Sequence, residues 1–207
     1  IIDDSKTEVI SATYQDVIST YTDKVIDGYK LSNEENLPLI VDFIEENNVI
    51  KIYYVKDIFG YTVEYYYDGN IDNSKTDVIN ATYQDVVSTY TDKVIDGYKL
   101  ERVENNPLTV TSNADNNVMK IYYIKDNFDY TVEYYYDETI DNSKTEVLNA
   151  TFADIIDSYA DKNITGYRLD RTENVPLTIT ENENTNVIKV YYVKDNFDYT
   201  VEYYYDG

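Results

Sequence analysis

Tyrosine is the residue type in this chain that could do the most chemistry, because 26 of the 207 residues are tyrosine. Aromatic rings stack on the faces of sugars, and the phenol hydroxyl adds a hydrogen bond. The segment Tyr-Thr-Val-Glu-Tyr-Tyr-Tyr-Asp occurs three times, and strand alternation places the middle tyrosine of its Tyr-Tyr-Tyr run on the outward face. The candidate ligand-binding residues are therefore Tyr66, Tyr135 and Tyr204. Packing of cross-strand aromatic residues on a sheet surface explains the same pattern.

Acidic side chains offer a second chemistry, since Asp and Glu number 40 against 17 Lys and Arg. The loops 68–74 and 113–116 concentrate the oxygen ligands that calcium prefers. However, the spacing of an EF-hand is absent, and ordinary turns use the same residue types. We therefore predict no metal site and no cofactor, with calcium kept as a weak alternative.

Composition disfavours several classes of function. The chain has no His, Cys or Trp, so the usual general base, the thiol nucleophile, disulfides and Cys/His metal sites are all missing. The formal net charge of −23 disfavours nucleic acid and anionic membrane surfaces as partners, because both attract basic segments. A hydrophobic content of 43% is that of a folded chain. We predict a folded protein that is not an enzyme and has no catalytic residues.

The chain repeats itself at an offset of 69 residues without insertion or deletion, and its length is three times that period. Gly-Tyr pairs recur at Gly28, Gly97 and Gly166, and Pro-Leu pairs recur at the same interval. A period of 69 exceeds the roughly 20–50 residues of solenoid repeats. Each copy therefore has the size of a small domain.

Hydrophobic periodicity predicts the elements of one copy. Strands are expected at 130–136, 147–151, 167–172, 176–180 and 187–194, where apolar residues alternate or cluster between turn residues. Phe152, Ile155, Ile156 and Tyr159 have the spacing of one helix face, and Thr151 with Asp154 resembles a capping box. The expected fold class is α+β, with one short helix crossing a mixed sheet in each copy.

The order of these features resembles the mucin-binding-protein (MucBP) repeat family of Gram-positive cell-surface adhesins. The resemblance rests on the strand 131–134, the acidic turn after it, the segment that contains Tyr90, the Gly97–Leu100 step and the tyrosine-rich strand 118–125. It covers nearly the whole chain, three times over. It implies three tandem β-grasp (ubiquitin-like) domains, which would form an elongated rod. It also implies an extracellular location, with cell-wall attachment through regions outside this chain, and adhesion to host mucin or glycoprotein glycans. The family often has a glycine before its helix, where this chain has Gln15, Gln84 and Ala153.

The expected first strand of each copy, Tyr-Thr-Val-Glu, sets the boundaries. The copies are then 1–60, 61–129 and 130–198, with 199–207 as a further first strand. The first copy lacks that strand within this chain. Three explanations stay open: flanking sequence supplies it, residues 61–68 fold back onto their own copy, or residues 199–206 of another molecule supply it. For the last, the exchange residues are Tyr199, Val201, Tyr203 and Tyr205.

These observations predict a tandem-repeat segment of a surface adhesin that acts as a stalk, as a multivalent binder of mucin glycans, or as both. The alternative is a structural fibre subunit that assembles head to tail by exchange of Tyr199–Asp206.

Overall fold

Strands form almost all of the regular structure in this computed structural model, which describes residues 2–162 and 164–206. The helical content of these residues consists of three single 3₁₀ turns, η1 (Glu45–Asn47), η2 (Ala114–Asn116) and η3 (Glu183–Thr185). None of these turns has the length or apolar character that a bilayer span requires.

The chain divides into two compact units, which are described separately. One unit comprises Ile1–Tyr65, Asp72–Thr91 and Val103–Ile121, and the other comprises Tyr66–Ile71, Asp92–Arg102 and Tyr122–Gly207. The first copy lies in one unit and the third copy in the other, whereas the second copy contributes to both.

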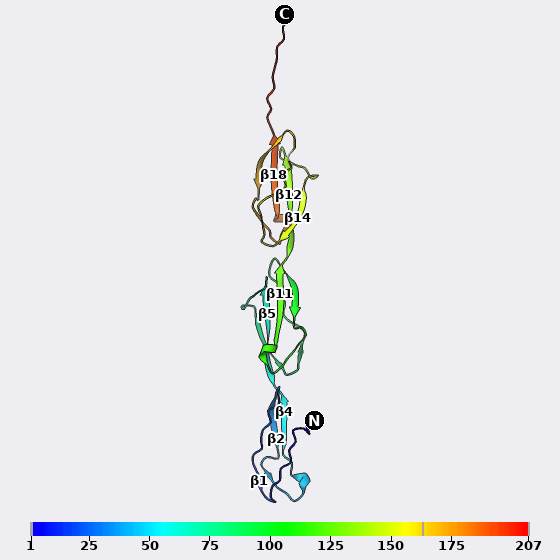
Figure 1. Cartoon of the computed structure of the whole chain (residues 1–207), viewed down its shortest axis with the longest axis vertical. Helices are drawn as coiled ribbons and strands as arrows, with labels where there is room; N and C mark the ends of the chain where they lie inside the picture. The colour runs from blue at the N-terminus through cyan, green and yellow to red at the C-terminus, as the bar shows by residue number, and fades with distance from the viewer. Residues whose placement is uncertain (1, 163, 207) are drawn as a thin grey trace. The chain divides into compact units, whose positions relative to one another are not determined.

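The third copy shows the complete architecture (Figure 1). Its main sheet has the order β13-β12-β18-β16, and β14 pairs with β12. Strands β12 and β18 run parallel to each other, while the other pairs are antiparallel. A small separate sheet joins β15 to β17. The strands are β12 (Asn127–Tyr136), β13 (Thr139–Ile140), β14 (Glu146–Thr151), β15 (Ile155–Ile156), β16 (Tyr167–Glu173), β17 (Leu177–Thr178) and β18 (Val187–Lys194).

The second copy repeats this arrangement. Its sheet has the order β6-β5-β11-β9, with β7 paired to β5, and β8 pairs with β10. The strands are β5 (Ile58–Tyr67), β6 (Asn70–Ile71), β7 (Asp77–Thr82), β8 (Val86–Val87), β9 (Tyr98–Glu104), β10 (Leu108–Thr109) and β11 (Val118–Lys125).

The first copy has fewer strands than the other two. Strand β2 pairs with β4 in a two-stranded sheet, and β1 pairs with β3. Its strands are β1 (Val17–Ile18), β2 (Tyr29–Glu35), β3 (Leu39–Ile40) and β4 (Lys51–Lys56). Strand β4 therefore occupies the place of β11 and β18, but pairs along one edge only among the described residues.

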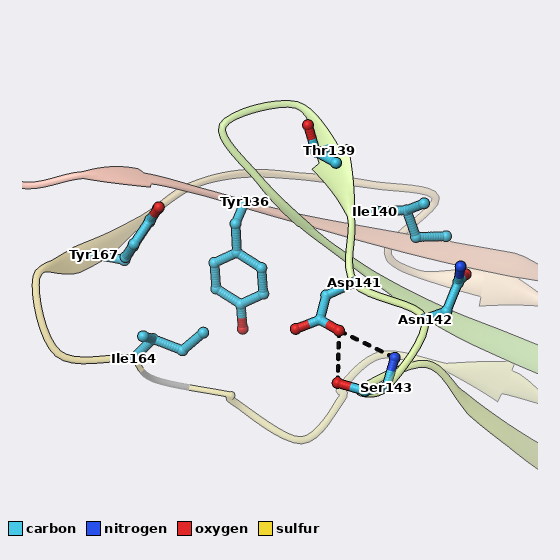
Figure 2. Close-up of a pocket in the computed structure, with 8 residues that line it drawn as sticks. All are labelled: Tyr136, Thr139, Ile140, Asp141, Asn142, Ser143, Ile164 and Tyr167. Atoms are coloured by element: carbon cyan, nitrogen blue, oxygen red, sulfur yellow. Dashed lines mark hydrogen bonds between the residues drawn. The ribbon is translucent and has the colours of Figure 1, made fainter.

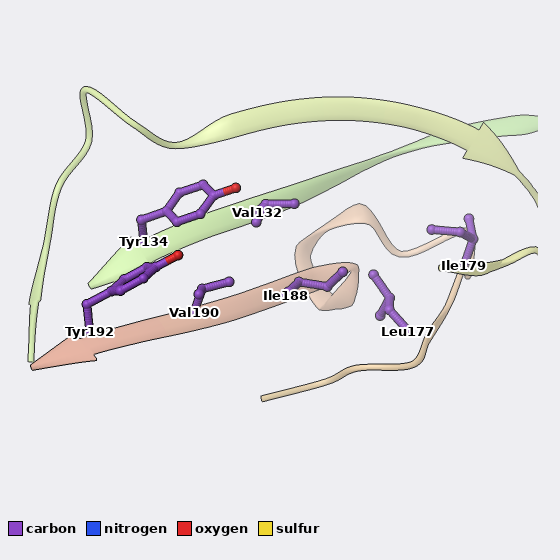
Figure 3. Packing of buried hydrophobic residues seen from close by; sticks show 7 residues of the cluster. All are labelled: Val132, Tyr134, Leu177, Ile179, Ile188, Val190 and Tyr192. Atoms are coloured by element: carbon purple, nitrogen blue, oxygen red, sulfur yellow. The ribbon is translucent and has the colours of Figure 1, made fainter. Parts of the chain in front are cut away.

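The core of the third copy follows from the alternation of its two parallel strands. Val132 and Tyr134 of β12 lie beside Ile188, Val190 and Tyr192 of β18 on the same face of the sheet, and all five side chains are buried (Figure 3). Leu177 and Ile179 close the cluster from the β17 side. The period-2 prediction for both strands is confirmed, because each inward residue alternates with a more exposed neighbour.

The prediction of one helix per copy is wrong, and with it the α+β class and the β-grasp (ubiquitin-like) fold that the resemblance implied. Ile155 and Ile156 form β15, which pairs with Thr178 and Leu177. Ala153, like Gln15 and Gln84, has a positive φ near +65°, which a helix cannot accommodate. Tyr159 packs against the core from a segment without regular secondary structure. Apolar residues with the spacing of a helix face thus lie here in a short strand and in the loop that follows it.

Tyrosine hydroxyls bond to the backbone of that loop. The Tyr134 hydroxyl donates to the carbonyl oxygen of Ala160 at 2.6 Å, and the Tyr136 hydroxyl donates to that of Lys162 at 3.0 Å. In an α-helix these carbonyls would accept from amides four residues later. Because the tyrosines of β12 occupy them, the segment is fixed by contacts distant in sequence.

A buried asparagine closes the other end of the sheet. Asn186 is fully buried, accepts from the Thr180 amide at 3.0 Å, and donates to the carbonyl oxygens of Thr180 at 2.7 Å and Asp129 at 3.2 Å. Asn117 makes the equivalent bonds in the second copy. Each asparagine ties the start of the last strand to the residue that precedes the Tyr-Thr-Val-Glu segment.

Candidate functional site

Two of the three predicted ligand-binding tyrosines lie in matching ring stacks. The rings of Tyr66 and Tyr122 have centroids 4.7 Å apart and an interplanar angle of 20°, and those of Tyr135 and Tyr191 have centroids 4.7 Å apart at 21°. Tyr135 and Tyr191 are register partners on the parallel strands β12 and β18. The alternation that puts both residues on the outward face of their strands thus places them side by side, although Tyr191 is only 7% exposed.

An arginine covers each stack. The guanidinium carbon of Arg102 lies 3.6 Å from the centroid of the Tyr122 ring, and that of Arg171 lies 3.8 Å from the centroid of Tyr191. A guanidinium at that distance leaves no room for a stacked ring on the same face of the tyrosine. The rings of Tyr122 and Tyr191 therefore each lie between an arginine on one face and a tyrosine on the other. We call these two groups the Arg–Tyr–Tyr columns: Arg102–Tyr122–Tyr66 and Arg171–Tyr191–Tyr135.

Carboxylates surround the column of the third copy. Arg171 donates from Nη1 and Nη2 to the two carboxylate oxygens of Glu138, at 2.8 and 3.0 Å. The Tyr135 hydroxyl donates to Glu133 at 2.7 Å, and this hydrogen bond raises the pKa of Tyr135 to about 12. The Tyr191 hydroxyl donates to Glu173 at 3.3 Å. The column therefore presents a cation, phenol hydroxyls and carboxylates in a small area, a combination that can hydrogen-bond to sugar hydroxyls.

Tyr204, the third predicted residue, lies in a different environment. Its side chain is 86% exposed and its hydroxyl donates to Glu202, and within the described residues its ring stacks on no other ring. The first copy also lacks a column. Tyr53 stands where Tyr122 and Tyr191 stand, but Asn33 replaces the arginine, and the Tyr53 hydroxyl donates to Glu35 at 2.9 Å.

The strand-exchange residues Tyr199, Val201, Tyr203 and Tyr205 all lie in the segment after β18. Residues 195–206 have no regular secondary structure, and all four side chains are more than half exposed. In Figure 1 the segment is a trace without an arrow.

A pocket of about 470 Å³ lies beside the repeated Asp-Asn-Ser turn of the third copy, between that turn and Tyr136, Ile164 and Tyr167 (Figure 2). Asp141 points into it and accepts from the amide and hydroxyl of Ser143, at 3.0 and 2.6 Å, and from the Lys144 ammonium at 2.8 Å. These bonds, Lys144 first among them, lower the pKa of Asp141 to about 2.

The weak calcium alternative finds no ligand cluster. Among the described residues, no group of three or more His, Cys, Asp and Glu side chains could hold a metal ion. In the turn 68–74, the Asp72 carboxylate already accepts from the Ser74 amide and hydroxyl, as the equivalent residue does in the third copy.

Sequence reasoning missed the two arginines and their tyrosine partners. Arg102 and Arg171 occupy equivalent positions in β9 and β16, and this recurrence at an offset of 69 was the available signal. A register shift between Leu169 and Arg171 in β16 decides which side chains reach Tyr191, and strand alternation does not reveal such a shift.

Comparison with known proteins identifies no family for this chain. No family model matches it. No curated protein matches it either. One solved structure that matches, titled "Crystal structure of Mub-RV", is 14% identical over 66% of this chain and 99% of that chain, with a TM-score of 0.22. A match at this identity and TM-score carries no argument about fold or function.

Proposed function

We propose that this chain is a non-enzymatic tandem-repeat segment of a bacterial cell-surface adhesin that binds host mucin glycans. The observation that carries the proposal is the recurrence of the Arg–Tyr–Tyr column in two copies, with centroid distances that agree. The resemblance of the motif order to the MucBP repeats supports the same function. The copies keep the boundaries 1–60, 61–129 and 130–198, and the segment acts outside the cell.

The chemistry of the column suits a polyhydroxylated ligand. Stacking on the arginine and on the neighbouring ring covers both faces of Tyr122 and Tyr191, and the Lys189 ammonium lies 6.0 Å from the centroid of the Tyr135 ring. Sugar would therefore contact the polar groups at the rim of the column. Single contacts of this kind are weak. Two columns on one chain raise the effective concentration of the second site once the first is occupied, which favours multivalent glycoproteins over free sugars.

Binding to immobilised mucin, measured by biolayer interferometry, tests the proposal. We expect the double variant Arg102→Ala/Arg171→Ala to bind at least about tenfold more weakly than the wild type, because both columns lose their cation. The matched control is Lys99→Ala/Arg168→Ala, which removes two equivalent positive charges from the same strands. Lys99 and Arg168 pair with Asp126 and Asp195 instead of lying on a tyrosine ring. Equal binding by the two variants, or no binding by the wild type, would refute the proposal.

A structural fibre subunit is the second candidate function. In such a subunit, residues 199–206, which repeat the sequence of 61–68 and 130–137, would pair with a strand of another molecule. Such a subunit would need no glycan, and filaments of the purified protein in electron micrographs would distinguish it from a dispersed binder.

A further inference from the structure

The first and last strands of a complete copy lie side by side in the middle of its sheet. In the third copy, β12 and β18 run parallel, with register pairs from Thr131–Val187 to Tyr136–Tyr192. Strands β13, β14 and β16 flank this pair, while β15 and β17 form the separate small sheet. A chain that enters the copy at β12 and leaves it after β18 therefore has its entry strand and its exit strand bonded to each other.

Hydrogen bonds secure both ends of this parallel pair. The Thr131 amide donates to the Asn186 carbonyl oxygen at 2.8 Å, and the Asp137 amide donates to that of Tyr192 at 3.0 Å. The buried Asn186 side chain adds its bond to the Asp129 carbonyl oxygen at 3.2 Å. The second copy makes the same three bonds, which join Thr62 to Asn117, Asp68 to Tyr123, and Asn117 to Gly60.

Two tyrosine stacks bridge the same pair of strands, one on each face of the sheet. Tyr135 and Tyr191 stack on the outward face, within the column. Tyr136 and Tyr192 stack on the core face, with centroids 5.2 Å apart and an interplanar angle of 15°. Tyr67 and Tyr123 form the equivalent stack of the second copy, at 5.2 Å and 13°. The tyrosines thus connect the two strands through side chains as well as through the backbone.

The chain passes from one copy to the next with almost no slack. Strand β11 ends at Lys125 and β12 begins at Asn127, so that Asp126 alone lies between them. The Asp126 amide donates to the Gly97 carbonyl oxygen at 2.8 Å, and its carbonyl oxygen accepts from the Phe152 amide at 2.8 Å. Tension along the chain would therefore pass from the last strand of one copy directly to the first strand of the next.

We propose that this parallel pair, β12 with β18 and equally β5 with β11, bears mechanical load and keeps its copy folded when the chain is pulled along its length. Tension applied before β12 and after β18 pulls the two strands past each other along their own direction. The backbone bonds and the tyrosine stacks then carry the load together and must break together. Tension applied across one end of the pair would break the same contacts one after another, at a lower force.

The proposed function supplies the load, because flow pulls on a chain that attaches a cell to mucus. The inference rests on that function for the source of the load alone, since the resistance itself involves no glycan. The second copy lies between the other two in the sequence, so tension reaches it through β4 on one side and through β12 on the other. The copies then carry the same load in series.

Single-molecule force spectroscopy on the full chain tests the proposal, because the natural chain has no cysteine and introduced cysteines can serve as its attachment points. Asn127→Cys/Asn196→Cys is held at the start of β12 and after β18, which loads the pair in shear. Thr139→Cys/Asn196→Cys is the matched control, held beyond the same end of both strands, which peels the pair open. All three replaced side chains are exposed.

We expect the sheared variant to unfold at a force at least about twofold higher than the peeled variant at the same loading rate, because forced unfolding is governed by the unfolding barrier along the direction of pulling. The two variants should have the same free energy of unfolding in urea, which attributes the difference to the direction of the force. Equal unfolding forces in the two geometries, or a lower force in shear, would overturn the proposal. The measurement contains no mucin, so its outcome is independent of the glycan-binding experiment.

The tyrosine stack has a separate test in the shear geometry. Tyr136→Leu and Tyr159→Leu each remove one tyrosine that packs against the same core, but only Tyr136 stacks on a ring of the neighbouring strand. We expect Tyr136→Leu to unfold at a lower force than Tyr159→Leu. Equal forces for these two variants would exclude a load-bearing role for the stack.

Discussion

At the scale of single residues, the buried asparagines Asn117 and Asn186 link two parts of each complete copy. Each is fully buried and bonded to backbone groups on both sides. Removing one partner of a buried hydrogen bond costs more free energy of unfolding than the bond contributes in the intact protein. The reason is that water cannot reach the group that is left unpaired. Each asparagine therefore stabilises the sheet only while all of its hydrogen bonds are made.

Replacing Asn186 by alanine should lower the free energy of unfolding by about 3 kcal/mol, because buried backbone groups of Thr180 and Asp129 lose their partners. Asn117→Ala should cost a similar amount. Asn48→Ala should cost roughly 1 kcal/mol, since the first-copy site is half-buried and water can reach it. Urea titration followed by tyrosine fluorescence measures the three variants against the wild type. Equal losses for Asn48→Ala and Asn186→Ala would contradict this explanation.

At the scale of elements, the segment expected to be helical is held as a loop by tyrosine hydroxyls. Tyr134 bonds to Ala160 in the third copy, and Tyr65 bonds to Thr91 in the same way at 2.6 Å. Tyr192 accepts from the Lys162 amide at 3.1 Å and donates to Asp161. The hydroxyl of Tyr134 or Tyr65 can make its bond only while it keeps its proton.

These tyrosines predict a loss of stability at alkaline pH. Burial raises the pKa of Tyr123, Tyr134 and Tyr192 well above the ordinary value of 10.0, and nearby carboxylates add to the shift. Because the folded-state pKa is raised, the contribution to stability is complete below pH 10 and is lost as pH rises toward the folded-state pKa. Phenolate absorbance and far-ultraviolet circular dichroism, followed together in an alkaline titration, check this. Complete ionisation of all tyrosines while the β signal persists would show the expectation to be wrong.

Strands were predictable from the sequence where apolar and more polar residues alternate along the chain. Alternation over 130–136 and 187–194 predicted β12 and β18 and the inward face of each. The helix prediction failed because Phe152, Ile155, Ile156 and Tyr159 fit one helix face equally well. The features that exclude a helix, a left-handed Ala153 and hydroxyls from β12, are not visible in that spacing.

The candidate site was predictable in part for the same reason. Strand alternation identified Tyr66 and Tyr135, but their stacking partners depend on the pairing of strands whose paired residues are 56 positions apart, as with Tyr135 and Tyr191. The position of Arg171 over Tyr191 depends further on the register shift in β16. Such contacts arise from tertiary structure.

At the scale of the whole molecule, the Arg–Tyr–Tyr columns of the second and third copies lie on one chain. Two sites on one chain raise the effective concentration of the second site once the first is occupied. The net charge of −23 makes separate molecules repel one another, so the multivalency that we propose arises within one molecule.

Biolayer interferometry on immobilised mucin, with variants that lose one column or both, tests most directly whether the columns bind together. We expect Arg102→Ala and Arg171→Ala each to weaken binding, and the double variant to bind at least about tenfold more weakly than the wild type, because the second column acts at a raised effective concentration only while the first is intact. Binding by the double variant that equals binding by the wild type would contradict this.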